Sequence, residues 1–287
     1  MTTYAVTGAT GQLGRLAVLA LLDRGVPASE LIAIVRNEAK AEPLAERGVR
    51  VRVADYDDAE ALDKAFAGVD RLLFVSGSEV GQRERQHRAI VGAARACGVS
   101  RIAYTSIARA TENSMPLGAE HRATEALLRE SGIATLLLRN SWYVENYTDQ
   151  LAQYLAAGAV IGATGSARIA AAPRTDYAEA AAAALVDDAA PGVYELGGPA
   201  FTMAELAAAV STATGRELPY RDVSLEDFEA GLLAAGLDAG TAAFVTALER
   251  GAAAGELDVP VTDLERLLGR PATDLGTAVH RLIGDPR

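Results

Sequence analysis

Close to its start the chain reads Tyr4-Ala5-Val6-Thr7-Gly8-Ala9-Thr10-Gly11-Gln12-Leu13-Gly14. The apolar residues predict a short strand, the glycines a tight turn, and the apolar run from Leu16 to Leu22 a helix that ends at Gly25. In such a unit the first glycine permits the turn, the second lets the backbone approach a pyrophosphate, and the third allows helix and strand to pack closely. The helix N-terminus then faces the anion. We therefore expect dinucleotide binding by Thr7, Gly8, Thr10, Gly11, Gln12, Leu13 and Gly14.

The composition is typical of a soluble enzyme. The chain has 287 residues, enough for one large domain and a smaller part, and its formal net charge is −11. This charge argues against nucleic-acid binding, which needs a basic face. No apolar run is long enough to cross a membrane, and the N-terminus does not resemble a signal peptide. Cys97 has no second cysteine to pair with, and its helical context predicts a buried, inert thiol. We expect a cytoplasmic protein without a metal site.

Downstream, predicted strands alternate with predicted helices. Five further strands are expected at Leu31–Val35, Val49–Val53, Arg71–Val75, Arg101–Thr105 and Thr135–Leu138. Helical patterns lie between them at about 59–67, 82–97 and 119–131, and each ends at a glycine in the position that a C-cap glycine prefers. The strands are nearly all apolar, which indicates burial on both faces of a parallel sheet covered by helices. The sequence therefore predicts an α/β fold with a Rossmann-type, doubly wound parallel sheet.

The later part of the chain predicts a smaller, mostly helical substrate-binding part. Strands are expected at Ile169–Ala172 and Gly192–Leu196, with a helix at 177–187 between them. Thr202 to Glu205 and Ser224 to Asp227 resemble capping boxes that begin helices. We assign residues 1–140, together with about 168–198, to the dinucleotide-binding domain. The substrate-binding part takes about 141–167 and 199–287.

The residue after the second strand decides the type of cofactor. An acidic residue there binds the ribose 2′-hydroxyl of NAD, whereas an arginine accommodates the 2′-phosphate of NADP. Arg36 holds this position with no acid beside it; the alternative is an ordinary surface arginine. Asp55, after the third strand, either contacts adenine or caps its own turn. The loop Ser76-Gly77-Ser78 follows the fourth strand, where ligands of parallel sheets bind. We predict NADP(H) as the cofactor.

At this point the chain resembles the NmrA-like atypical short-chain dehydrogenases, and within them the bacterial type-2 NAD(P)H:quinone oxidoreductases. The resemblance is carried by Thr7 to Gly14, Val35-Arg36-Asn37, Leu138-Arg139-Asn140-Ser141-Trp142-Tyr143-Val144-Glu145-Asn146-Tyr147 and Leu264 to Pro271. It covers nearly the whole chain. It implies flavin-free hydride transfer from NADPH to a quinone and, in many members, a homodimer.

The chain departs from ordinary short-chain dehydrogenases in its proton relay. Those enzymes carry Tyr-x-x-x-Lys on the helix after the fifth strand, and no such motif occurs here, although Ser106 holds a plausible serine position. Reduction of a carbonyl to an alcohol needs that relay, because it creates a strongly basic alkoxide. A reduced quinone is a phenolate-like anion with a pKa of about 10, and it needs the relay less. The missing motif therefore favours a quinone as substrate.

His121 and Glu125 lie one turn apart on that helix, so they are expected to pair. The carboxylate would then raise the pKa of the imidazole and favour its protonated form. The resemblance also places His121 where isoflavone-reductase-like proteins carry a lysine. The alternative is a solvated surface pair without a catalytic role.

Trp142, Tyr143 and Tyr147 follow the sixth strand in a chain with few aromatic residues. They could stack on a planar quinone, or pack the junction between the two parts of the chain. Asn140 could bind the nicotinamide or a quinone oxygen. We take His121, Tyr143 and Asn140 as catalytic candidates, and Trp142, Tyr143 and Tyr147 as substrate-binding candidates.

Two other functions stay open on the sequence alone. NmrA-like regulators also lack the tyrosine–lysine pair, so one alternative is a non-catalytic sensor that binds NADP(H). The second alternative is an NADPH-dependent reductase of an aromatic or phenolic double bond, with His121 replacing the lysine. The segment Arg174-Thr175-Asp176-Tyr177 is expected to be structural, with Asp176 capping the helix that follows.

Overall fold

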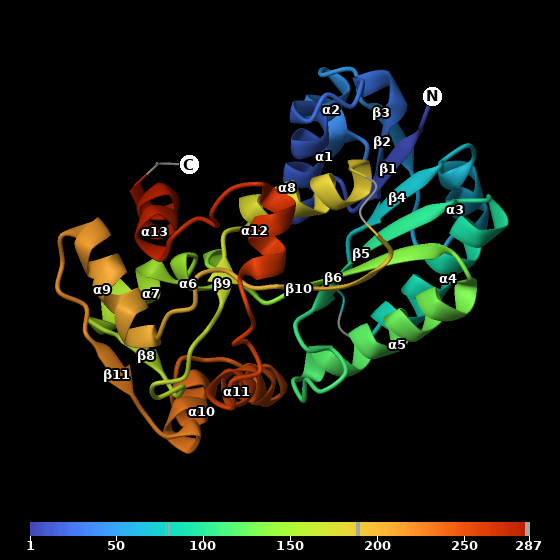
Figure 1. The fold of residues 1–287 in the computed structure, drawn as a ribbon. Coiled ribbons are helices and arrows are strands. Elements are labelled where there is room, and N and C mark those ends of the chain that lie inside the picture. The colour runs from blue at the N-terminus through green and yellow to red at the C-terminus, as the bar shows by residue number, and fades with distance from the viewer. Residues whose placement is uncertain (78, 80, 188–189, 285–287) are drawn as a thin grey trace.

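The computed structural model describes residues 1–77, 79, 81–187 and 190–284. Within them, seven parallel strands form one sheet in the spatial order β10-β6-β5-β4-β1-β2-β3 (Figure 1). These strands are β1 (Tyr4–Thr7), β2 (Leu31–Val35), β3 (Arg50–Val53), β4 (Arg71–Phe74), β5 (Arg101–Ile107), β6 (Ala134–Asn140) and β10 (Gly192–Leu196). The order reverses direction between β1 and β4, so the predicted Rossmann-type, doubly wound sheet is confirmed.

Helices cover both faces of the sheet. One face carries α1 (Gln12–Asp23), the short α2 (Glu42–Ala45), α8 (Arg174–Val186) and α12 (Thr262–Leu268), and the other carries α3 (Ala59–Phe66), α4 (Arg83–Ala96) and α5 (Pro116–Ser131). Neighbouring strand residues alternate between the two cores: Val6 belongs to the first and Ala5 to the second. Both faces are apolar, which explains the absence of alternation in the sequence. The edge strand β3 is the exception, since Val53 is exposed.

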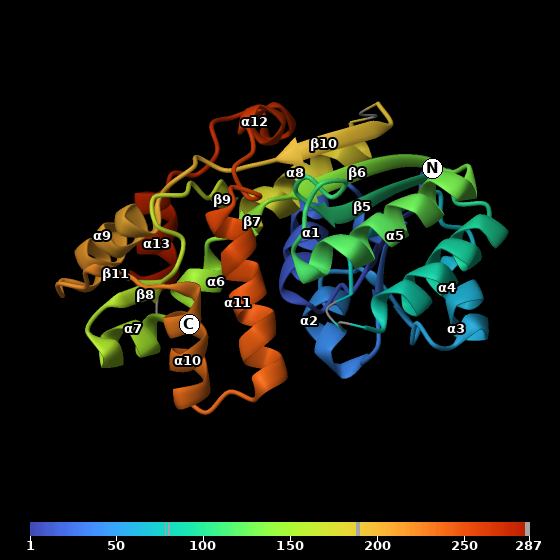
Figure 2. The same cartoon turned by 90° about the horizontal axis from the view of Figure 1, so that it is seen from below.

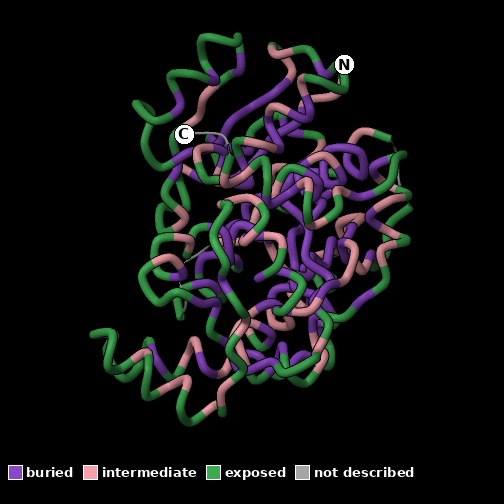
Figure 3. The backbone as a smooth tube through the Cα atoms, turned by 90° about the vertical axis from the view of Figure 1, so that its left-hand side faces the viewer, coloured by how far each residue is buried: buried purple, intermediate pink, exposed green. Residues whose placement is uncertain are grey.

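The rest of the chain forms a second part beside the carboxyl ends of the strands, with its own apolar core (Figure 1). Its elements are α6 (Glu145–Thr148), α7 (Leu151–Ala157), β8 (Val160–Gly162), α9 (Met203–Thr214), β11 (Tyr220–Asp222), α10 (Leu225–Ala234), α11 (Ala239–Ala253) and α13 (Leu275–Gly284). The pair β7 (Trp142–Tyr143) and β9 (Ala171–Ala172) lies between the two parts. In Figure 2, α10 and α11 extend side by side away from this core. In Figure 3, the buried backbone gathers in the interior of the molecule.

One segment returns from the second part to the sheet. Leu264 and Leu268 of α12 belong to the core around α8, so residues 199–287 do not all pack in the smaller part as the expected division had it. None of the helices in the described ranges is long and apolar enough to span a membrane.

The helix ends test the predicted caps. Thr202 and Glu205 form a complete capping box, and Ser224 accepts a hydrogen bond from the backbone N–H of Asp227. The prediction that Asp176 caps α8 was wrong, because the chain enters the helix through Pro173 and Asp176 lies inside the first turn. The buried Asp176 carboxylate instead accepts hydrogen bonds from the backbone N–H of Thr273, at 2.7 Å, and from the guanidinium of Arg270, at 2.9 Å. Its role is to tie α8 to the segment before α13.

Candidate active site

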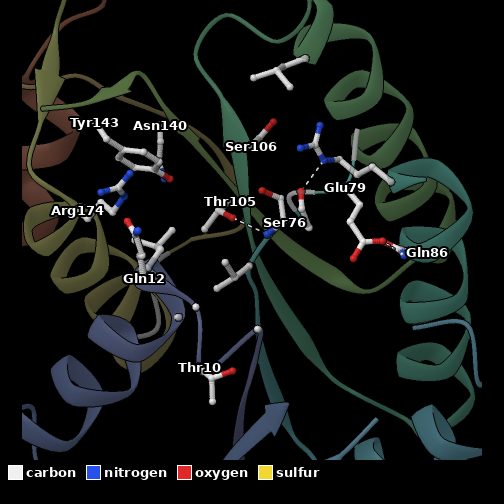
Figure 4. A pocket seen from close by; sticks show the side chains of 18 of the residues that line it. Thr10, Gln12, Ser76, Glu79, Gln86, Thr105, Ser106, Asn140, Tyr143 and Arg174 are labelled. Carbon is white, nitrogen blue, oxygen red and sulfur yellow. Dashed lines mark hydrogen bonds between the residues drawn. The ribbon is translucent and has the colours of Figure 1, made fainter. Parts of the chain in front are cut away.

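A cavity of about 670 Å³ opens at the carboxyl ends of the strands, between the sheet and the second part (Figure 4). Ligands of doubly wound sheets bind at this edge. The wall contains thirteen of the residues that the sequence predicts for the site: Gly8, Thr10, Gly11, Gln12, Leu13, Gly14, Arg36, Ser76, Gly77, His121, Asn140, Trp142 and Tyr143. Thr7, Asp55 and Tyr147 are not part of it, and Ser78 lies outside the described residues.

The turn at the start of α1 needs glycine at Gly8 for its backbone conformation and at Gly14 for its packing. Gly8 has a φ of +59°, which favours glycine. A Cβ on Gly14 would lie 2.2 Å from the carbonyl oxygen of Gly8, so Gly14 is the residue that allows helix and strand to approach. Gly11 is the N-cap of α1 and gives the helix no side-chain cap. The amide groups of the first turn therefore have no side-chain partner, and the residues that carry them line the cavity. This turn has the shape and the donors that a pyrophosphate requires.

Thr7 does not line the cavity. Its hydroxyl accepts a hydrogen bond from the backbone N–H of Val75, at 3.0 Å, and so joins the ends of β1 and β4 below the cavity. Asp55 likewise turns back on its own loop, where its carboxylate accepts a hydrogen bond from the backbone N–H of Asp57, at 3.0 Å. Of the two roles considered for Asp55, the structure shows the turn cap.

Arg36 stands at the end of β2 on the cavity wall, with Asn37 and Lys40 nearby. Its guanidinium pairs with the carboxylate of Glu79, and the second oxygen of Glu79 accepts a hydrogen bond from the amide of Gln86, at 3.0 Å. The arginine side chain is 59% exposed, so a phosphate in the cavity can reach it. Such a contact would exchange one anionic partner of Arg36 for another.

The expected pair of His121 and Glu125 does not form. His121 is buried, and its Nδ1 lies 2.7 Å from the hydroxyl of Tyr104 on β5. Burial, helped by the positive charge of Arg83, lowers the pKa of His121 from 6.5 to about 3. The expectation of a raised pKa and a protonated ring was therefore wrong: at neutral pH this histidine is neutral.

Glu125 instead belongs to a buried ion pair below the wall. Both of its oxygens accept hydrogen bonds from Arg139, at 2.9 and 2.7 Å, and one also accepts from the hydroxyl of Ser106, at 2.7 Å. Arg139 reaches the carboxylate of Glu195 on β10 as well, at 3.0 Å. The cluster fixes Ser106 at the cavity and connects α5, β5, β6 and β10.

Asn140, Tyr143 and Arg174 come together at the other end of the cavity (Figure 4). The Oδ1 atom of Asn140 is buried and has no hydrogen-bond partner among the described residues, so it is available to a ligand. The guanidinium of Arg174 lies 4.9 Å from the centre of the Tyr143 ring. Sequence reasoning treated Arg174 as structural and missed it, because its position after a proline at the start of α8 carried no signal of a site.

Tyr147 has a packing role, but inside the second part and not at the junction between the two parts that the sequence suggested. It is buried in the core of the second part, where its ring meets that of Phe201 at a centroid distance of 6.3 Å. Trp142 and Tyr143 do line the cavity. The aromatic segment therefore divides between the cavity wall and the core.

His87 was also missed, since a lone histidine in a helical pattern has no distinguishing neighbours in sequence. It is fully buried in α4, and its Nε2 accepts a hydrogen bond from the backbone N–H of Gly77, at 3.1 Å. Arg83, from the same helix, donates to the carbonyl oxygen of Gly77, at 2.8 Å. Together they hold the loop after β4 against the cavity.

The two buried histidines predict a loss of stability in mild acid. In the folded protein burial lowers the pKa of His121 and of His87 to about 3, whereas the unfolded chain binds these protons near pH 6.5. Below pH 6.5 the unfolded chain therefore takes up protons that the folded protein does not. For each histidine this lowers the free energy of unfolding by about 1.4 kcal/mol at pH 5.5. In urea titrations, the difference in unfolding free energy between wild type and His121→Asn should shrink by that amount between pH 7.5 and 5.5. An unchanged difference would contradict a neutral His121.

The residues at the cavity fit a dinucleotide. The glycine turn can hold the pyrophosphate, Arg36 the 2′-phosphate, and the unpartnered Oδ1 of Asn140 a carboxamide N–H. For the residues that the structure describes, no group of three or more His, Cys, Asp or Glu could hold a metal ion.

Comparison with known proteins places the chain among NAD(P)H-binding reductases. Residues 8–188 match the NAD(P)H-binding family. The chain is 45% identical to quinone oxidoreductase 2 of Escherichia coli over 280 residues, 97% of this chain and 98% of the relative. A crystal structure of the E. coli NADPH-dependent quinone oxidoreductase complexed with NADPH matches with a TM-score of 0.93, covering 98% of this chain and 99% of that one.

A second solved structure is of a reductase that acts on another class of molecule. It is the triphenylmethane reductase of Citrobacter complexed with NADP(H), 38% identical with a TM-score of 0.88, covering 98% of this chain and all of that one (100%). These likenesses extend over both parts of the fold and confirm the resemblance seen in the sequence. The chain therefore belongs to the NAD(P)H-binding, NmrA-like family of reductases.

Proposed function

We propose that this protein is an NADPH-dependent, flavin-free quinone reductase. The proposal rests on one observation above the others: a single cavity joins a glycine turn and an arginine, suited to NADP(H), to an aromatic and amide wall suited to a planar acceptor. The 45% identity to quinone oxidoreductase 2 supports the same reaction. NADPH, when bound, supplies the hydride, and the acceptor gains in total two electrons and two protons.

The residues of this chain would bind the cofactor and the acceptor and orient them toward each other. The amide groups of the turn from Gly8 to Gly14 hold the pyrophosphate, and Arg36 reads the 2′-phosphate. Asn140 accepts a hydrogen bond from the carboxamide and so orients the nicotinamide ring. Trp142 and Tyr143 form the apolar side of the acceptor site and exclude water from it.

The proton that completes the product would come from water. His121 is neutral at working pH, because burial lowers its pKa to about 3, and it has no charged form to act as a strong acid. A reduced quinone is a phenolate-like anion with a pKa of about 10, which water can protonate. Hydride delivery in a fixed geometry is then sufficient for turnover.

A steady-state assay tests the function directly. Purified protein without added flavin should oxidise NADPH in the presence of 1,4-benzoquinone, and much more slowly without it. Tight binding of NADPH with no turnover on any quinone would favour the NADP(H)-binding sensor instead. Turnover on phenolic alkenes but not on quinones would favour the double-bond reductase.

Arg36 should decide the choice between the two nicotinamide cofactors. Its contact with the 2′-phosphate is a charge-assisted hydrogen bond, worth about 1.5–3 kcal/mol. Arg36→Ala should therefore weaken NADPH binding at least about tenfold in calorimetry and leave NADH binding nearly unchanged. Arg47→Ala, an exposed arginine away from the cavity wall, is the matched control. Equal losses for both cofactors would show that Arg36 does not read the phosphate.

We also propose that the protein works in the cytoplasm, where its one thiol would stay reduced. Cys97 is half-buried at the end of α4, less buried than the sequence predicted, and partial burial raises its pKa. A raised pKa means a less reactive thiol, in keeping with the inert role expected. The homodimer that the resemblance implies stays a prediction.

A further inference from the structure

Four rings lie in contact between the sheet and the helices behind the cavity. Phe74, His87, Tyr104 and His121 follow one another with centroid distances of 4.6 to 5.8 Å. Tyr104 is completely buried in β5, and His121 forms part of the cavity wall. The polar atoms of Tyr104 and His87, which are closed off from solvent, must be satisfied within the protein, so their hydrogen bonds determine where each proton lies.

The position of the proton on His87 follows from its neighbours. A backbone N–H can only donate, so the contact of 3.1 Å from Gly77 leaves Nε2 of His87 without a proton. In the neutral ring the proton is then on Nδ1, which donates to the hydroxyl oxygen of Thr124 at 2.8 Å. Thr124 in turn donates its own proton to the carbonyl oxygen of Glu120, at 3.0 Å. His87 is therefore the Nδ1–H tautomer.

The same reasoning gives the opposite tautomer for His121. The Tyr104 hydroxyl has no solvent, and the acceptor that it meets is Nδ1 of His121, at 2.7 Å. Thr124 also lies beside the Tyr104 hydroxyl, but its oxygen already accepts a hydrogen bond from Nδ1 of His87 and its proton goes to Glu120. A buried phenol proton without an acceptor is costly, so we assign the Tyr104 proton to the contact of 2.7 Å with Nδ1 of His121. Nδ1 of His121 then carries no proton.

The remaining nitrogen of His121 is the one available to a ligand. Burial and the charge of Arg83 keep the ring neutral, with a pKa of about 3, so the proton that Nδ1 lacks is on Nε2. Nε2 has no hydrogen-bond partner within the described part of the chain. A neutral N–H donor of this kind can polarise a carbonyl oxygen without giving up its proton.

We propose that Tyr104 is a positioning residue that holds His121 in the Nε2–H tautomer, so that His121 donates a hydrogen bond to the carbonyl oxygen of the bound acceptor. The identity of the acceptor rests on the proposed function, but the tautomer does not. The arrangement selects acceptors that present an oxygen lone pair at this point of the wall. It orients them for hydride transfer and leaves the proton transfer to water.

The side-chain nitrogen spectrum of the protein labelled with ¹⁵N-histidine tests the tautomers without any substrate. The chain has three histidines, and the exposed His280 supplies the third signal, identified by its substitution. We expect His121 to show a protonated Nε2 and His87 a protonated Nδ1, both unchanged from pH 5 to 8. A protonated Nδ1 on His121, or a doubly protonated ring in this range, would overturn the proposal.

Tyr104→Phe tests the positioning role, because it keeps the ring and removes the donor. We expect the His121 signals to show a mixture of tautomers, and kcat/KM for the quinone to fall about two- to tenfold with the KM for NADPH unchanged. The loss should vanish in a His121→Ala background. Tyr194→Phe is the matched control, since it removes a buried tyrosine hydroxyl that bonds to Ala190 far from the cavity.

The outcomes separate this proposal from the proposed function. A His121 tautomer unchanged by Tyr104→Phe would show that Tyr104 does not set it, even if quinone reduction is normal. An equal loss in the presence and absence of His121 would mean that Tyr104 acts only on packing. If the protein shows the expected tautomers but reduces no quinone, the assignment of His121 as an Nε2–H donor stands and the proposed quinone substrate is wrong.

Discussion

Replacement of Gly14 by alanine is expected to lower the affinity for NADPH by more than about 100-fold. A Cβ at this position would lie 2.2 Å from the carbonyl oxygen and 2.8 Å from the carbonyl carbon of Gly8. Both are backbone atoms, so the turn must move away from the helix, and its amide N–H groups then no longer point toward the pyrophosphate. Two charge-assisted hydrogen bonds lost in this way cost about 3–6 kcal/mol, which corresponds to that factor or more. Calorimetry with NADPH measures it.

Gly92→Ala is the matched control for this substitution. Gly92 lies exposed inside α4, and an added Cβ would meet nothing within 4 Å. Alanine there should stabilise the helix by up to about 1 kcal/mol and leave cofactor binding unchanged. Circular dichroism would show that Gly14→Ala still forms its sheet and helices. Wild-type affinity in a folded Gly14→Ala protein would place the phosphate site elsewhere.

Glu125→Ala is expected to lower the free energy of unfolding by about 3–5 kcal/mol, because it leaves a buried guanidinium without its main partner. Both side chains of the pair are at least 92% buried: Arg139 is 8% exposed and Glu125 is 2% exposed. The pair has two hydrogen bonds, which are lost together, and Ser106 loses its acceptor as well. Urea unfolding monitored by fluorescence of the single tryptophan measures the loss.

Glu195→Ala removes the second carboxylate on the same arginine and serves as the control. Glu195 is 28% exposed, so water can replace it, and the expected cost is about 1 kcal/mol. Similar losses of unfolding free energy for the two variants would show that the buried pair of Glu125 and Arg139 stabilises the fold no more than the exposed contact does. A small loss for Glu125→Ala alone would mean that Arg139 finds water or another acceptor when the carboxylate is gone.

The sheet was predictable because its signals are local. Each buried strand is a short apolar run between turn residues, and β2 and β10 begin and end where the sequence placed them. The ends of β5 and β6 were predicted too short, since Ser106, Arg139 and Asn140 are polar and an apolar pattern stops before them. These same residues reach the cavity or the ion pair beneath it. The ends of β5 and β6 are thus hardest to predict from an apolar pattern because their last residues are polar side chains of the site.

The pairing of the charged residues was not predictable, because it depends on distance in space. One turn of helix separates His121 from Glu125, and their spacing suggested a pair. The partner that Glu125 selects, Arg139, is brought beside α5 by the alignment of β5 with β6. A guanidinium with two donors binds a carboxylate better than an imidazole does. Because Glu125 is paired with Arg139, the charge of His121 is governed by burial, helped by the positive charge of Arg83.

The unpartnered oxygen of Asn140 links the lifetime of the protein to the supply of its ligand. A buried carbonyl oxygen without a donor costs about 1–3 kcal/mol, and a ligand that offers an N–H there removes that cost. Such a ligand binds the folded chain and not the unfolded one, so each tenfold excess over its Kd adds about 1.4 kcal/mol to the free energy of unfolding. Depletion of the reduced and oxidised cofactor together would therefore expose the chain to proteases sooner. Abundance of this protein would then follow the cellular pool of nicotinamide nucleotide, with no regulator involved.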